Sequence, residues 1–173
     1  MASGDSGRGD GVVRTLSIGA PPDELLQAWR DPAVQRQVMA HFAELVEYDG
    51  ARMRWRASGV LGHALEWETH EAEFLPGSSV SHRGDHDANV GADTRLTVRP
   101  APADFGTEAT LRVDYRLPGG ALGEAAAKLL GAAPETLAAT ALRRFKSLVE
   151  TGEIPNLARN PSARPKDHQP QRE

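Results

Sequence analysis

Apolar and polar residues alternate through the middle of the chain, between Leu45 and Tyr115. A period of two is typical of strands that bury one face and expose the other. Turn-forming residues, such as Gly50, Pro76 and Gly77, separate the alternating runs. The pattern predicts six strands, at residues 44–49, 52–58, 64–74, 78–83, 93–100 and 107–117.

The second and third of these strands predict a hairpin with a defined register. If the hairpin is centred on Leu61, Trp55 lies opposite Trp67 on one face, which is then apolar. A shift of one residue would place apolar positions against charged ones, so the pattern favours this register. The alternation breaks after His70, and we expect a bulge over residues 71–74. On the opposite, solvated face we expect the ion pairs Arg54–Glu68 and Arg56–Glu66.

A further strand and two short helices are expected before this region. Residues 12–18 alternate in the same way and end at a proline-containing turn. Apolar residues follow at helical spacing from Asp23 onward. Asp31 and Pro32 then start a second short helix, because proline fits the first turn of a helix.

A long helical run lies near the C-terminus, from about Ala121 to Glu150. Pro134 cannot occupy a helix interior, so we expect a short helix, a break at Gly131 and a main helix that begins at Pro134. Gly152 suits the C-terminal cap of this main helix. The apolar stripe of the whole run is rich in alanine and consists of Leu130, Ala133, Leu137, Ala141, Phe145 and Leu148.

All the expected strands turn an apolar face to the same side, and the C-terminal helix is the element left to cover that face. We therefore predict an α+β helix-grip fold. It comprises a curved antiparallel sheet of about seven strands wrapped on the long C-terminal helix, with two short helices after the first strand.

Composition fits one domain with short tails. The chain has 173 residues, of which 39% are hydrophobic and 25% charged. We expect residues 11–155 to form the domain, and residues 1–10 and 156–173 to be disordered, because they contain almost nothing apolar to bury.

Charge and the absence of certain residue types limit the partners. The net charge of −4 gives no reason to expect nucleic acid, and no stretch is apolar enough for membrane insertion. No cysteine is present, so disulfides and thiolate catalysis are excluded. We expect a soluble, cytoplasmic protein without a cofactor; the sequence does not indicate its oligomeric state.

Ordered motifs give the chain a resemblance to a known family. They include Trp29-Arg30-Asp31, Trp55, Gly59-Val60-Leu61-Gly62, Glu66-Trp67-Glu68, Gly106-Thr107-Glu108, Tyr115, Gly119-Gly120, Pro134, Leu142-Arg143-Arg144-Phe145-Lys146 and Glu150-Thr151-Gly152-Glu153-Ile154-Pro155. In this order the chain resembles the polyketide cyclase/dehydrase-type branch of the START-like (SRPBCC) superfamily over about residues 12–155. The resemblance implies a deep, largely apolar cavity between sheet and helix that admits hydrophobic small molecules such as lipids or polyketides.

The predicted cavity is lined by the inward positions of the strands and of the C-terminal helix. These positions are Met53, Trp55, Leu65, Trp67, His82, Leu96, Val98, Leu111, Val113, Tyr115, Leu130, Leu137 and Ala141. The two tryptophans can stack on a guest or fill the core.

His82 and Tyr115 are the two candidates for chemistry. In the alternation of its strand His82 falls on the inward side, where its imidazole can exchange a proton with a ligand carbonyl. The structural alternative is that His82 lies at the cavity rim, because its strand is close to its end. An inward Tyr115 can orient a polar ligand atom or pack in the core. Asp85, His86 and Asp87 follow His82, but so polar a loop usually faces solvent, and we expect no metal site.

Three functions remain open at this point. The first is binding of a hydrophobic small molecule in the cavity. The second is a cyclase or dehydrase that moves protons with His82 and Tyr115, which requires both side chains to open into one cavity. The third is a protein-interaction or coenzyme-chaperone module with a closed cavity, in which the segment after Asn156 makes the contact.

Overall fold

The computed structural model describes residues 11–58, 64–88, 90–116 and 134–153. All seven predicted strands are present, and their bounds differ from the expected ones by at most two residues. The elements are β1 (Gly11–Ile18), α1 (Pro22–Arg30), α2 (Pro32–Met39), β2 (Glu44–Tyr48), β3 (Arg52–Ser58), β4 (Ala64–Leu75), β5 (Ser79–Gly84), β6 (Gly91–Pro100), the 3-10 turn η1 (Pro102–Asp104), β7 (Thr107–Arg116) and α4 (Pro134–Thr151).

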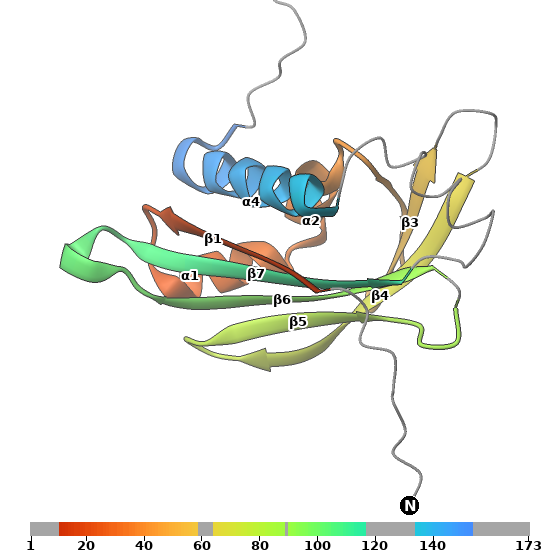
Figure 1. Ribbon diagram of the computed structural model, residues 1–173, viewed down its shortest axis with the longest axis horizontal. Helices are drawn as coiled ribbons and strands as arrows, with labels where there is room; N and C mark the ends of the chain where they lie inside the picture. Colours follow the sequence, from red (N-terminus) through yellow and green to blue (C-terminus); the bar gives the residue numbers. More distant parts are fainter. Residues whose placement is uncertain (1–10, 59–63, 89, 117–133, 154–173) are drawn as a thin grey trace, which may run out of the picture.

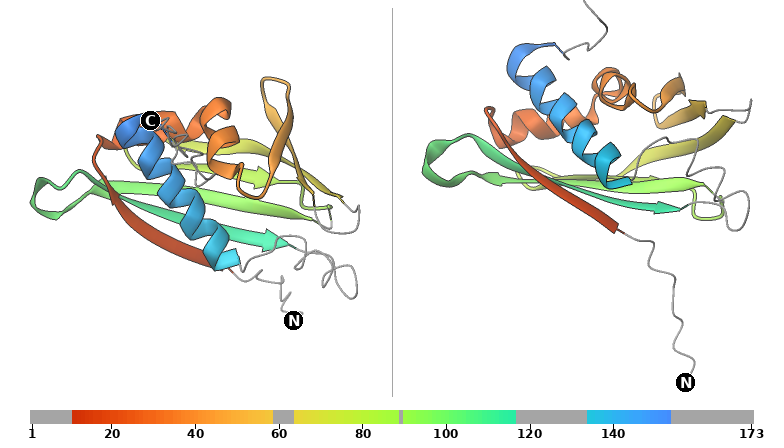
Figure 2. Two further views of the ribbon diagram at one scale, coloured as in Figure 1. Left: turned by 90° about the horizontal axis from the view of Figure 1, so that it is seen from above. Right: turned by 45° about the horizontal axis from the view of Figure 1, so that its top comes forward.

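The strands form a single curved antiparallel sheet in the order β1-β7-β6-β5-β4-β3-β2. The three α-helices among the described residues lie on one face of this sheet, and β3 and β4 rise beside them (Figure 1). Helix α4 runs over β1 and β7, next to α2 (Figure 2). The predicted α+β architecture is therefore confirmed as a seven-stranded antiparallel sheet covered by helices, one of which is C-terminal.

The register of the β3–β4 hairpin is the predicted one, with Trp55 opposite Trp67. The expected bulge is also present, because the pairing of β4 with β5 shifts between Glu71 and Glu73. On the outer face the side chains of both predicted ion pairs meet. The nearest nitrogen–oxygen distances are 2.8 Å for Arg56–Glu66 and 3.3 Å for Arg54–Glu68.

Helix α2 begins at Pro32, as predicted, and α1 begins at Pro22, one residue before the expected start at Asp23. Pro22 and Pro32 each occupy the first turn of a helix, where the missing N–H costs no helical hydrogen bond. The Asp31 carboxylate caps α2 by accepting a hydrogen bond from the N–H of Ala33 at 2.8 Å.

Helix α4 also has the predicted ends. It begins at Pro134 and is followed by Gly152, whose φ of 74° closes the helix and lets its N–H donate to Leu148 O at 2.8 Å. The short helix expected before Gly131 lies outside the described residues.

Two polar contacts hold the C-terminal part of α4 against the end of β1. Lys146 Nζ donates to Ser17 O at 2.7 Å, and the N–H of Gly19 donates to Glu150 Oε1 at 2.8 Å. These contacts fix the height of α4 above the sheet at one end. No helix among the described residues is long and apolar enough to cross a membrane.

The main hydrophobic core lies at this same end of the molecule, beneath α1 and the C-terminal half of α4. Trp29 of α1 and Phe145 of α4 meet edge to face, with ring centroids 5.0 Å apart. A second, smaller cluster of Ala43, Leu45, Met53 and Trp55 lies at the β2–β3 end. The space between the two clusters is the candidate site.

Candidate functional site

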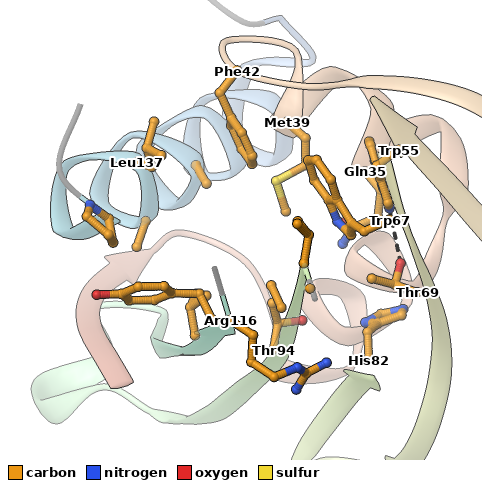
Figure 3. A pocket seen from close by; sticks show the side chains of 18 of the residues that line it. Gln35, Met39, Phe42, Trp55, Trp67, Thr69, His82, Thr94, Arg116 and Leu137 are labelled. Carbon is orange, nitrogen blue, oxygen red and sulfur yellow. Dashed lines mark hydrogen bonds between the residues drawn. The ribbon is translucent and has the colours of Figure 1, made fainter. Parts of the chain in front are cut away.

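A cavity of about 140 Å³, partly open to solvent, lies between the sheet, α2 and the N-terminal half of α4 (Figure 3). It lies next to both hydrophobic clusters. Its apolar and glycine lining consists of Met39, Phe42, Met53, Trp55, Leu65, Trp67, Val90, Gly91, Ala92, Leu111, Val113, Pro134, Leu137, Ala138 and Ala141. Its polar or amphipathic lining consists of Gln35, Thr69, His82, Thr94, Tyr115 and Arg116.

Aromatic rings form one wall of the cavity. Phe42 and Trp67 are nearly parallel, with an interplanar angle of 9° and ring centroids 6.4 Å apart. The indole N–H of Trp55 donates to Thr69 Oγ1 at 3.0 Å, the dashed line in Figure 3. Because Thr69 accepts this proton, the buried Trp55 needs no polar partner from a guest and presents an apolar ring.

His82 of β5 is buried, with 5% of its surface exposed, and lines the cavity. Its register partners are Glu71 on one side and Thr94 on the other. Among the described residues no hydrogen bond reaches its ring. Burial lowers the pKa of His82 from 6.5 to about 4, against a smaller opposing effect of the Glu71 charge, which Arg30 engages through two hydrogen bonds of 2.7 and 3.0 Å. The imidazole is therefore neutral at neutral pH.

Gln35 of α2 is a second buried polar residue in the lining, with 4% of its surface exposed. Its Nε2 donates to the backbone oxygen of Trp29 at 2.7 Å. A carbonyl oxygen can only accept, so the amide nitrogen must face Trp29. The side-chain Oε1 of Gln35 then remains, and no described residue donates to it.

Arg116, at the end of β7, is the one charged side chain in the described lining. Its Nη1 lies 3.7 Å from Asp93 Oδ2, and its Nη2 donates to Asp85 O at 3.0 Å. The Nε atom is buried and donates to no described residue. The charge of Arg116 is thus largely balanced by Asp93.

Most of the expected lining residues surround this cavity. They are Met53, Trp55, Leu65, Trp67, His82, Leu111, Val113, Tyr115, Leu137 and Ala141. His82 and Tyr115 open into the same space, and His82 is buried rather than at a solvated rim.

Two expected lining residues, Leu96 and Val98, lie elsewhere, and their assignment to the cavity is corrected. Both belong to the main core, where α1 packs directly on β6 and places Leu25 and Leu26 in that core. Alternation places residues on the inner face along the whole length of a strand. It therefore cannot distinguish inner-face residues that pack in the core from those that line a cavity. Leu130, also expected in the lining, lies outside the described residues.

Several lining residues were missed by the sequence reasoning. Gln35 and Met39 are four positions apart on α2, and this spacing was a usable signal for one helical face turned inward. Three more missed residues continue the inward alternation of Trp67 or Leu96, which was also a usable signal: Thr69, Ala92 and Thr94. The others lie in turns, at strand ends or near the start of α4, where alternation gives no guide: Phe42, Val90, Gly91, Arg116, Pro134 and Ala138.

The described residues contain no group of three or more histidine, aspartate or glutamate side chains placed to hold a metal ion. His82 turns inward, whereas Asp85, His86 and Asp87 are exposed in the turn that follows β5. The segment after Asn156 lies outside the described residues.

The chain matches no family model and no curated protein sequence. It is similar in structure to the Deinococcus radiodurans protein DR_A0006, with 28% identity and a TM-score of 0.61 over 83% of this chain and 99% of that one. It is also similar to TTHA0849 from Thermus thermophilus, with 19% identity and a TM-score of 0.62 over 83% and 99% of the two chains. CV1439 from Chromobacterium violaceum shares 17% identity at a TM-score of 0.57, over 82% and 98%. These similarities support the fold.

Proposed function

We propose that this protein is a START-like ligand-binding domain that binds a hydrophobic small molecule between the sheet and α4. The observation that carries the proposal is the apolar cavity beneath α4, walled by Trp55 and Trp67. Concave, mostly apolar sites with a few polar groups are typical of small-molecule binding. The sequence motifs shared with the polyketide cyclase/dehydrase-type family support the same proposal.

The volume limits the part of a ligand that the cavity can enclose. A cavity of about 140 Å³ is close to the apolar cavity of roughly 150 Å³ that holds benzene in an engineered protein. One ring or a short alkyl segment therefore fits inside. A longer lipid or polyketide would place such a segment in the cavity and the remainder at its open side.

A matched pair of substitutions on α4 tests the proposal. Ala138 is buried and lines the cavity, whereas Ala139 is half-buried and does not line it. We expect Ala138→Leu to fill the cavity and to weaken toluene binding about tenfold or more, since the added methylene groups occupy the volume of the guest. Ala139→Leu makes the same chemical change outside the cavity and retains wild-type affinity.

Isothermal titration with toluene and native mass spectrometry with a panel of single-ring aromatic and short-chain compounds provide the readouts. The proposal fails if wild-type protein retains none of these compounds. It also fails if Ala138→Leu binds toluene as tightly as the wild type does.

A cyclase or dehydrase is the second candidate function, because His82 and Tyr115 line the same cavity. The pKa of about 4 for His82 makes its imidazole a weak base at neutral pH, which favours binding over proton abstraction. Incubation with a short poly-β-ketone thioester, with product analysis by mass spectrometry, tests this function. Cyclisation or loss of water that disappears in both His82→Phe and Tyr115→Phe supports catalysis; an unchanged substrate contradicts it.

A further inference from the structure

Three polar side chains in the cavity lining are more than nine-tenths buried: Thr69 and His82 from the sheet and Gln35 from α2. Thr69 accepts the indole N–H of Trp55, whereas no described residue hydrogen-bonds the ring of His82 or Oε1 of Gln35. An unpaired buried polar group costs free energy, because it has left water without gaining a partner. In a ligand-binding cavity such groups fix the orientation of the guest.

The chemistry of each unused polar group shows whether it can donate or accept a hydrogen bond. Oε1 of Gln35 is an acceptor, since its amide nitrogen is committed to Trp29 O at 2.7 Å. Neutral His82 offers one donor and one acceptor. Thr69 accepts from Trp55 and keeps its hydroxyl proton as a further donor. The available groups therefore include both donors and an acceptor, and a matching ligand group must be able to accept and to donate.

The balance of charge argues against an anionic ligand group. Arg116 is the one charged side chain in the described lining, and Asp93 lies 3.7 Å from it. A carboxylate has no proton to donate, so it would present negative charge to the acceptor oxygen of Gln35. A carbonyl accepts but does not donate. A hydroxyl does both and carries no charge.

We propose that the cavity selects a neutral, ring-sized apolar molecule that carries one hydroxyl group, and that His82 and Gln35 hydrogen-bond this hydroxyl. The inference rests on the proposed function, because it names the ligand class of the same cavity. Trp55, whose N–H is already donated to Thr69, contributes apolar surface for the ring of the ligand. Thr94 of β6 lies opposite His82 of β5 and places its own hydroxyl near His82 in the cavity lining (Figure 3).

Three probes of similar size separate the contributions of the apolar ring, the hydroxyl and the negative charge: toluene, benzyl alcohol and benzoate. Toluene has no polar group, benzyl alcohol has a neutral hydroxyl, and benzoate is an anion. Isothermal titration gives the affinity of each for wild-type protein, for His82→Phe and for Gln35→Met. Phe and Met are apolar and comparable in size to the His and Gln side chains that they replace, so each substitution removes the polar group. His86→Gln, in the exposed turn after β5, serves as the control.

We expect the affinity ratio of benzyl alcohol to toluene to fall about tenfold in His82→Phe, the size of effect that one buried hydrogen bond produces. Gln35→Met lowers the ratio in the same direction, and His86→Gln leaves it unchanged. Comparing this ratio between a variant and the wild type cancels the different hydration free energies of the two probes. If one variant does not fold, the other still tests the prediction.

The outcomes distinguish this inference from the function on which it rests. If no probe binds, the proposed function fails. If toluene binds but neither substitution changes the ratio, the hydroxyl inference is overturned, and His82 and Gln35 hold water instead. If benzoate binds most tightly, the cavity selects an anion and the inference is also overturned.

Discussion

Acidification should destabilise the protein through His82. Burial lowers the pKa of its imidazole from 6.5 to about 4, so the unfolded chain binds a proton between these pH values and the folded protein does not. The free energy of unfolding therefore falls as the pH decreases from 6.5 to 4. A difference of about 2.5 pKa units at 1.36 kcal/mol per unit gives about 3 kcal/mol. Three neighbouring groups act on the same imidazole: Glu71 favours protonation, whereas His70 and Arg30 oppose it.

Urea unfolding at pH 7 and at pH 4 measures this contribution. It equals the loss of unfolding free energy in wild-type protein minus the loss in His82→Phe. In wild-type protein the loss of stability includes other groups, among them His41, whose pKa is also lowered by burial. In His82→Phe the loss should be smaller by about 3 kcal/mol, because the titrating group has been removed. His86→Gln should lose as much stability as the wild type. Equal losses in His82→Phe and in wild-type protein would refute the assignment of His82 as a buried neutral imidazole.

Three further substitutions test the packing by urea unfolding. Leu96→Ala should destabilise the protein by about 2–5 kcal/mol without changing toluene affinity, because Leu96 lies in the core and not in the cavity; weaker toluene binding without destabilisation would contradict this. Gly106→Ala should destabilise by about 1–3 kcal/mol, since φ is 82° and a Cβ would collide with the backbone oxygen of Ile18; wild-type stability would contradict the turn geometry. Arg56→Ala should cost no more than about 1 kcal/mol, because its ion pair with Glu66 is exposed; a loss above about 2 kcal/mol would show a larger structural role.

The fold was readable from the sequence because strand periodicity and turn chemistry pointed to one arrangement. The opposition of Trp55 and Trp67 followed from parity alone, since a slip of one residue exchanges the two faces of a strand. The bulge near Glu71 followed from the break in that parity. Pro134 and Gly152 marked the ends of α4 through the backbone conformations that each residue favours.

The cavity was only partly readable, because parity gives the face of a sheet but not the element that covers each part of it. Leu96 and Trp55 share that inward face, yet α1 packs on β6 over Leu96 and leaves Trp55 beside open volume. The roles of Gln35 and Thr69 depend on contacts with residues that are 6 and 14 positions away in sequence. No local pattern encodes such contacts.

The most direct test of ligand binding beneath α4 is a crystal structure of the protein exposed to iodobenzene, whose iodine atom is located by anomalous scattering. We expect an iodine site within the space bounded by Trp55, Trp67 and Ala138, and its disappearance in Ala138→Leu. Iodine sites confined to the outer surface, with the space beneath α4 filled by protein or by water, would contradict it.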